Sequence, residues 1–137
     1  IPMSPNRFST HGGRKAKTGK RADLNNRFFR SSWEANYARH LNWLIQLKQI
    51  SHWEYEVDTF EFVPIKKGSR WYTPDFKVFE LDGSYSYHEV KGWMDAKSAT
   101  KLKRMKKYYP KETVIVVGKL EYTSIAKQMK TTIPNWE

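Results

Sequence analysis

Cysteine is absent from the sequence, which excludes disulfide bonds and cysteine-ligated zinc sites. No apolar run approaches the roughly 20 residues needed to span a bilayer, and no secretory signal pattern opens the chain. Acids are also scarce, since 14 Asp and Glu stand against 25 Lys and Arg, a formal net charge of +11. We therefore expect no membrane contact, a cytoplasmic location and a polyanionic partner.

The basic charge is concentrated in two blocks. Residues 1–30 carry eight Lys or Arg against one acid, and residues 91–111 carry eight against one, whereas residues 33–89 carry six against nine. Such blocks favour a nucleic-acid partner over the alternative of a solubilising surface. The residues expected to contact DNA are Arg14, Lys15, Lys17, Lys20 and Arg21 in the first block and Lys97, Lys103, Arg104 and Lys107 in the second.

A length of 137 residues suits one domain. Pro and Gly punctuate residues 1–27, which show no apolar period and are predicted to be a flexible basic arm, so that residues 28–137 form the folded domain. Apolar periods predict helices over 32–48, 95–109 and 122–129 and strands over 53–62, 72–80, 84–91 and 114–117. The predicted fold is a single α/β domain with a mixed central β-sheet flanked by helices.

A turn in the middle of the chain decides how two of these strands pair. Leu81-Asp82-Gly83 is typical of a three-residue hairpin loop with Gly83 in the left-handed conformation. In that register Asp75 lies directly opposite Glu89, and both side chains point to one face. A two-residue loop would instead put Asp75 opposite Val90, on the wrong face.

The pattern Asp75, Glu89 and Lys91 predicts hydrolytic chemistry. Residues two apart on a strand share a face, so Lys91 joins the two carboxylates. Paired carboxylates repel each other unless a cation lies between them, and Mg²⁺ prefers such oxygen ligands. Mn²⁺ is expected to substitute, and the carbonyl of Val90 to add an oxygen. Lys91 is expected to orient or deprotonate the attacking water, or to stabilise developing charge. The alternative is a surface salt bridge from Lys91 to Asp75 or Glu89.

Glu34 is a further acidic candidate. Ser31 followed by Glu34 forms the pattern of a helix capping box, which would give the acid a structural role. Glu34 also shares a helix face with Ala38, Leu41 and Ile45, which would place it over the Asp75/Glu89 patch as a metal-proximal group. The pattern alone leaves both interpretations open.

Other polar and aromatic residues carry weaker signals. His88 should point to the face opposite Glu89, so we interpret it as structural. Trp71 and Trp93 bracket the hairpin, where core or rim packing is favoured over stacking on bases.

The ordered motifs resemble a known family. The similar stretches are Ser31-Ser32-Trp33-Glu34, Tyr55-Glu56, Tyr72-Thr73-Pro74-Asp75-Phe76 and Glu89-Val90-Lys91-Gly92. Over about residues 30–118 they resemble the PD-(D/E)xK nuclease superfamily, and more narrowly the phage endonuclease I type of Holliday-junction resolving enzymes. The resemblance implies a restriction-endonuclease-like core in the order αβββαβα, metal ligands at Asp75 and Glu89 with Glu34 near the metal, and a catalytic Lys91. It also suggests a phage protein in a bacterial cytoplasm and a homodimer.

Three functions follow as hypotheses. The first is a Mg²⁺-dependent endonuclease of branched or structured DNA, acting in junction resolution and DNA recombination. The second is a nicking or sequence-specific duplex endonuclease. The third, of another class, is a DNA-binding module in which the carboxylates are structural.

Overall fold

A four-stranded sheet lies at the centre of the computed structural model, which describes residues 17–137. Its strands follow the order β3, β6, β7, β8. Neighbouring strands run antiparallel except for β7 and β8, which are parallel. Their bounds are β3 His52–Tyr55, β6 Phe76–Phe79, β7 Tyr85–Val90 and β8 Val114–Val117. The sheet is therefore mixed, as predicted.

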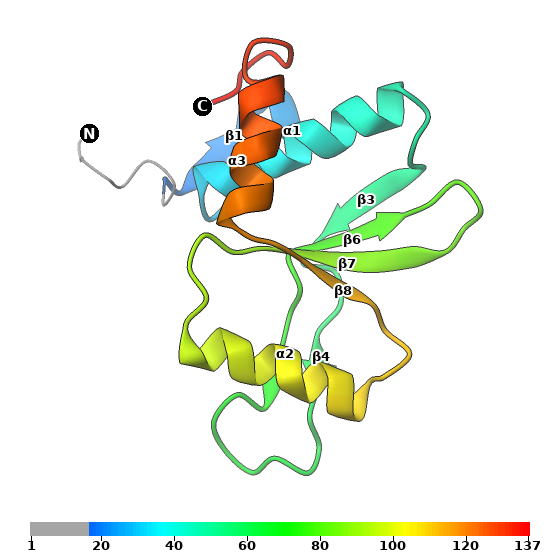
Figure 1. The fold of residues 1–137 in the computed structure, drawn as a ribbon, viewed down its shortest axis with the longest axis vertical. Helices are drawn as coiled ribbons and strands as arrows, with labels where there is room; N and C mark the ends of the chain where they lie inside the picture. Colours follow the sequence, from blue (N-terminus) through cyan, green and yellow to red (C-terminus); the bar gives the residue numbers. More distant parts are fainter. Residues whose placement is uncertain (1–16) are drawn as a thin grey trace.

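Three α-helices flank this sheet within the described residues: α1 Ser32–Gln46, α2 Ala96–Tyr108 and α3 Lys119–Met129. Helices α1 and α3 lie on one side of the sheet and α2 on the other (Figure 1). The predicted single α/β domain with a mixed sheet between helices is confirmed.

Helix boundaries follow from the capping residues. Ser31 accepts a hydrogen bond from the backbone N–H of Glu34 and starts α1, while Asp95 accepts one from the N–H of Ser98 and starts α2. Helix α3 begins at Lys119, three residues before its predicted start. The reason is local: the Glu121 carboxylate accepts the N–H of Gly118 at 3.0 Å and stabilises an earlier first turn.

The strand predicted over residues 53–62 is broken in two. Strand β3 ends at Tyr55, where Glu56 follows with a left-handed φ of 49°. The chain then leaves the sheet, and its second part, β4 Phe60–Glu61, pairs with β5 Trp71–Tyr72 in a separate two-stranded ribbon. The predicted strand over 72–80 is divided by the same departure, because only Phe76–Phe79 pairs in the central sheet.

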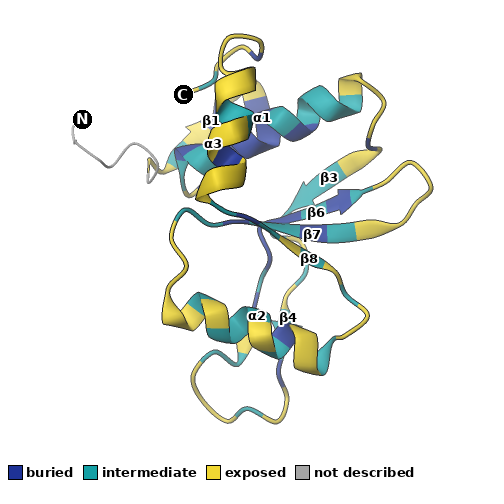
Figure 2. Ribbon diagram, in the orientation of Figure 1, coloured by how far each residue is buried: buried dark blue, intermediate teal, exposed yellow. Residues whose placement is uncertain are grey.

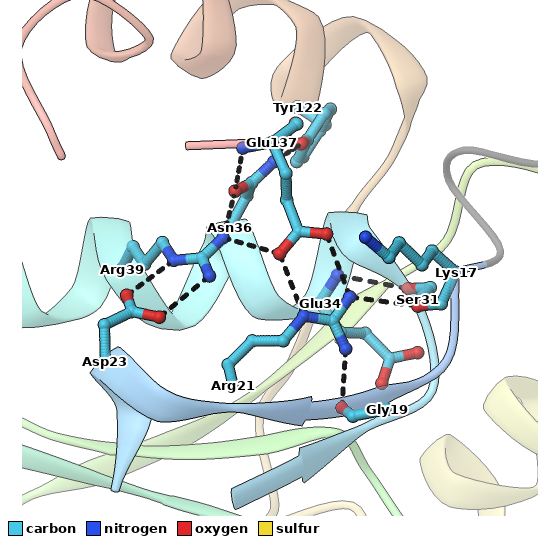
Figure 3. Close-up of polar contacts among 10 residues, drawn as sticks. All are labelled: Lys17, Gly19, Arg21, Asp23, Ser31, Glu34, Asn36, Arg39, Tyr122 and Glu137. Carbon is cyan, nitrogen blue, oxygen red and sulfur yellow. Dashed lines mark hydrogen bonds and ion pairs between the residues drawn. The ribbon is translucent and has the colours of Figure 1, made fainter. Parts of the chain in front are cut away.

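Residues 19–29 are folded, which corrects part of the predicted flexible arm. They form β1 Gly19–Arg21, a 3₁₀ turn Ala22–Leu24 and β2 Arg27–Phe29, with β1 and β2 antiparallel. Leu24 and Phe29 are buried in the main core. Arg21 is buried and makes two hydrogen bonds to the Glu137 carboxylate, at 2.8 and 3.0 Å (Figure 3). Residues 1–16 of the predicted arm lie outside the described residues.

Two separate apolar clusters hold the fold together. Buried positions occur on α1 and α3, on one side of the sheet, and on α2, on the other side (Figure 2). The larger cluster packs α1 and α3 on the sheet and includes Leu41, Phe76 and Tyr122. The smaller cluster packs α2 against the β4–β5 ribbon and is built on Phe62, Tyr72 and Met105. Met105 lies on α2, the helix that was predicted over residues 95–109. Asp75 lies in the chain between Tyr72 of the smaller cluster and Phe76 of the larger cluster.

Candidate active site

The β6–β7 hairpin brings Asp75 and Glu89 together. Phe76 pairs with His88 and Phe79 with Tyr85, which is the register expected for a three-residue loop, and Gly83 has the predicted left-handed φ, 91°. One step beyond the last pair, the backbone N–H of Asp75 donates to Glu89 Oε1 at 3.3 Å. The predicted juxtaposition of the two acids is confirmed.

Both carboxylates are held by further donors. The N–H of Val90 donates to Asp75 Oδ2 at 2.8 Å, and the Tyr72 hydroxyl donates to Glu89 Oε1 at 2.8 Å. Asp75 is only 4% exposed. These bonds fix one oxygen of each acid, and the other oxygens, Asp75 Oδ1 and Glu89 Oε2, accept no hydrogen bond from the part of the chain that the structure describes.

The carboxylates line a pocket of about 390 Å³. It opens between the N-terminus of α1, the central hairpin and α2. Its lining combines acids, cations and apolar groups: Arg30, Glu34, Trp71, Tyr72, Thr73, Asp75, Glu89, Val90, Lys91, Met94, Ser98, Lys101 and Leu102. All four residues predicted to be catalytic, Glu34, Asp75, Glu89 and Lys91, are therefore gathered in one place.

Burial and mutual repulsion make the two acids hard to ionise. Burial raises the pKa of Asp75 well above its ordinary value, and the charges of Glu89 and Glu34 raise it further. Burial also raises the pKa of Glu89, although the Tyr72 hydroxyl and the Asp75 N–H partly oppose the rise. A bound cation would relieve this repulsion, and no fixed Lys or Arg neutralises the pair at hydrogen-bonding distance within residues 17–137.

Glu34 forms only one of the two hydrogen bonds of a capping box with Ser31. Its backbone N–H donates to the Ser31 hydroxyl, but its carboxylate accepts a hydrogen bond from the hydroxyl of Tyr55, at the end of β3, and lines the pocket. The position of Glu34 on the first turn of α1 thus serves both interpretations: the backbone caps the helix and the side chain joins the acids.

Lys91 stands free of the acids. Among the ion pairs within 4.0 Å in residues 17–137, none joins Lys91 to Asp75 or Glu89, so the salt-bridge alternative is not what the structure has. Lys91 lines the pocket with its ammonium group available to a ligand. The role of the Val90 carbonyl as a metal ligand stays a prediction.

The donor set suits a hard cation. No group of three or more His, Cys, Asp or Glu lies in a metal-holding arrangement within residues 17–137. A Mg²⁺ ion that keeps several waters needs only one or two carboxylates, however. Asp75 and Glu89 each retain one oxygen that accepts no hydrogen bond within residues 17–137, and burial raises the pKa of both acids despite the nearby charges of Arg30 and Lys91. The residues therefore fit the ion in chemistry, and Glu34 lines the same pocket.

Sequence reasoning missed two cations of the pocket. Arg30 pairs with Glu56, and its Nη2 lies 3.9 Å from Asp75 Oδ1. The signal was present, since Arg30 stands directly before the cap of the helix that carries Glu34. Lys101 projects from α2 into the same pocket, one turn after Ser98.

The predicted DNA-binding residues divide into three groups. Lys17, Lys20, Lys97, Lys103 and Lys107 are exposed. Arg21 is buried against Glu137, so its predicted contact with DNA is wrong. Arg104 is partly exposed, and its Nη1 donates to the carbonyls of Gly68 and Ser69, which ties α2 to that loop; its contact with DNA stays a prediction. Arg14 and Lys15 lie outside the described residues.

His88 is structural, as interpreted from its strand position. Its Nδ1 shares a hydrogen bond of 2.6 Å with the Tyr37 hydroxyl, on the face away from Glu89. Burial lowers the pKa of His88 to about 4, so its ring is neutral at neutral pH.

Gly92 determines how the chain leaves the site after Lys91. A Cβ at this position would lie 2.9 Å from Cζ3 of Trp33, and the Trp33 ring is stacked on Tyr122 with centroids 4.1 Å apart. We expect Gly92→Ala to lower the free energy of unfolding by about 1–3 kcal/mol through overpacking. Urea denaturation measures the change.

Gly118→Ala is a suitable control for this variant. Its added methyl would also meet an atom at 2.9 Å, but that atom is the flexible end of Glu121. A smaller loss is expected there. A second substitution, Trp33→Phe, should restore part of the stability of Gly92→Ala, and the absence of coupling between the two changes would contradict the steric explanation.

None of the helices in residues 17–137 is long and apolar enough to cross a membrane. Comparison of the chain with the profiles of known protein families, with curated proteins and with solved structures gave no match.

Proposed function

We propose that this chain is a Mg²⁺-dependent endodeoxyribonuclease that hydrolyses phosphodiester bonds in branched or otherwise structured DNA. One observation carries the proposal: the buried Asp75 and the partly buried Glu89 lie side by side in the wall of a pocket that Lys91 also lines. A protein that only binds DNA gains nothing from buried acids facing a polyanion.

The arrangement of the elements supports the same proposal. If β1, β2 and the β4–β5 ribbon are taken as additions, the remaining elements follow the order α1, β3, β6, β7, α2, β8, α3, and we propose that they are the αβββαβα core implied by the resemblance to PD-(D/E)xK nucleases. The resemblance also motivates the choice of branched DNA and of a homodimer, in which two pockets would make paired cuts.

Each residue of the pocket has a role in this proposal. Asp75 and Glu89 would hold the cation, and Glu34 would accept a hydrogen bond from a water molecule in the same pocket. The ion, when bound, supplies a polarised phosphate and a bound water of lowered pKa. Lys91 orients the attacking water or neutralises charge on the phosphate. Tyr72 keeps Glu89 in place by donating to Oε1.

The positive charge of the surroundings supports a polyanionic substrate. Arg30, Lys91 and Lys101 line the pocket, and Lys97, Lys103 and Lys107 are exposed on the same helix as Lys101. Each phosphate that they neutralise would make binding more sensitive to salt.

A cleavage assay tests the proposal. The protein is incubated with a labelled four-way junction, a linear duplex of matched sequence and single-stranded DNA, each with Mg²⁺, Mn²⁺ or EDTA. We expect cuts with either metal, none in EDTA and none with Glu89→Ala. Glu80→Ala removes an exposed acid from the same hairpin and should cleave like the unmodified chain.

The substrates separate the alternative functions. Paired cuts in the junction alone would support junction resolution, and cleavage of the duplex as well would favour a nicking or sequence-specific nuclease. Binding of all three DNAs with no cleavage under any metal would overturn the enzyme and leave a DNA-binding module.

A further inference from the structure

An exposed tryptophan stands at the edge of the pocket. The side chain of Trp71 is on the pocket wall, yet the residue is 53% exposed. Its neighbour in the chain, Tyr72, is buried in the smaller core and donates to Glu89. The indole therefore lies one residue away from a group that holds the paired carboxylates.

The position of Trp71 is fixed by its strand. Trp71 pairs with Glu61 in the β4–β5 ribbon, and the N–H of Phe62 donates to the carbonyl of Arg70 at 2.7 Å. The Arg70 guanidinium pairs with Glu61 and lies 5.9 Å from the centre of the indole ring. Hydrogen bonds and strand pairing thus hold the backbone on both sides of the exposed ring. Because Trp71 is already ordered, binding of a ligand to it would cost less conformational entropy.

Beside its three acids, Glu34, Asp75 and Glu89, the pocket has apolar and cationic lining residues. Trp71, Met94 and Leu102 are apolar, whereas Arg30, Lys91 and Lys101 are cationic. An aromatic platform beside a line of cations is the usual construction of sites for unpaired nucleic acid, because every base has a π-face and every linkage a phosphate.

The volume of the pocket limits the size of the ligand that it can hold. A volume of about 390 Å³ is near the lower end of the range for small-molecule sites, roughly 300–1,000 Å³. A volume of this size suits one nucleotide.

Building on the proposed function, we infer that Trp71 stacks on an unpaired base next to the phosphate that is cut. Trp71 would then be a specificity-determining residue, and the preferred substrate would carry an unpaired nucleotide at the cleavage position. Paired DNA would have to unstack a base before reaching the carboxylates, at a cost of a few kcal/mol per base.

The chain offers a matched control. Trp93 is 75% exposed and lies two residues after Lys91, but it is not part of the pocket wall. Trp93→Ala removes the same amount of aromatic surface from the same region without touching the proposed stacking position.

Binding measured without metal tests the inference independently of cleavage. Fluorescence anisotropy in EDTA compares a labelled single strand, a duplex with a one-base bulge and a perfect duplex. We expect Trp71→Ala to weaken binding of the two unpaired substrates by about fivefold or more and of the duplex by less than about twofold. Trp71→Phe should keep most of the affinity, and Trp93→Ala should change all three by less than about twofold.

An abasic site in the bulge completes the design. Removing the base should abolish the difference between Trp71→Ala and the unmodified chain. An equal loss on the perfect duplex, or no loss on the unpaired substrates by a variant that melts normally, would overturn the inference. Cleavage without dependence on Trp71 would reject the stacking role alone, whereas Trp71-dependent binding without cleavage would reject the nuclease and leave the nucleotide site.

Discussion

Replacing Asp75 by Asn should lower the rate of DNA cleavage about 10³-fold or more and, in the same protein, raise the melting temperature in EDTA. Stabilisation of phosphate charge by a metal contributes several kcal/mol, and each 1.36 kcal/mol is a factor of ten in rate. Asn can still accept the N–H of Val90 through its oxygen, so the hairpin keeps its geometry while one negative charge is removed.

The gain in stability follows from the raised pKa of Asp75. A carboxyl with a higher pKa in the folded state binds more protons there than in the unfolded chain. The contribution of Asp75 is therefore most favourable below its ordinary pKa of about 3.9, and it is lost as the pH rises through the folded-state value. Asn has no charge to bury, so Asp75→Asn should not show this loss.

Thermal melts at several pH values, with EDTA or with Mg²⁺, measure the effect. In EDTA the difference in Tm between Asp75→Asn and the unmodified chain should grow as the pH rises from 4, and Mg²⁺ should stabilise only the unmodified chain. Glu80→Gln, in the exposed part of the hairpin, provides the control. Full cleavage by Asp75→Asn would contradict the ligand role, and a constant difference in Tm would contradict the burial of charge.

Replacing Glu137 by Ala should lower the free energy of unfolding by about 2–3 kcal/mol. The Glu137 carboxylate accepts hydrogen bonds from Arg21 and Arg39, two buried guanidinium groups (Figure 3). Burial alone would raise the pKa of Glu137, but these bonds outweigh burial and hold the pKa below its ordinary value. Removing one partner of a buried ion pair leaves an uncompensated charge, which costs about 3–5 kcal/mol. The expected loss is smaller because Arg39 keeps Asp23.

Urea denaturation compares Glu137→Ala with Glu112→Ala, which removes an acid whose hydroxyl partner, Tyr85, lies at 3.5 Å on the surface. The control should change stability by less than about 0.5 kcal/mol. Equal, small effects in both variants would mean that Arg21 and Arg39 find water or other acceptors when Glu137 is lost.

The part of the site predicted from sequence is the part that local turn chemistry determines. Leu81-Asp82-Gly83 is enough to fix the hairpin register, because the left-handed conformation of Gly83 is a property of three consecutive residues. The opposition of Asp75 and Glu89 then follows from counting along two strands. The face of Lys91 follows from the strand period.

The features that were missed depend on partners far along the chain. Nothing near Arg21 indicates that it is buried, since the acid that neutralises it is 116 residues away. The break after Tyr55 likewise depends on the pairing of β4 with β5, whose strands have two residues each and carry too short a pattern to be recognised. Sequence also favoured packing for Trp71, and only the structure reveals its exposure.

The two apolar clusters divide the residues that line the pocket into two groups, with the central sheet between them. Arg30 and Glu34 lie at the start of α1, on the side of the larger cluster. Lys101 and Trp71 lie on α2 and the β4–β5 ribbon, on the side of the smaller cluster. Asp75 and Glu89 both lie between these two groups, in the single β6–β7 hairpin of the central sheet. Because both carboxylates belong to one hairpin, their spacing depends on the pairing of β6 with β7 and not on the packing of the residues that line the pocket from either side.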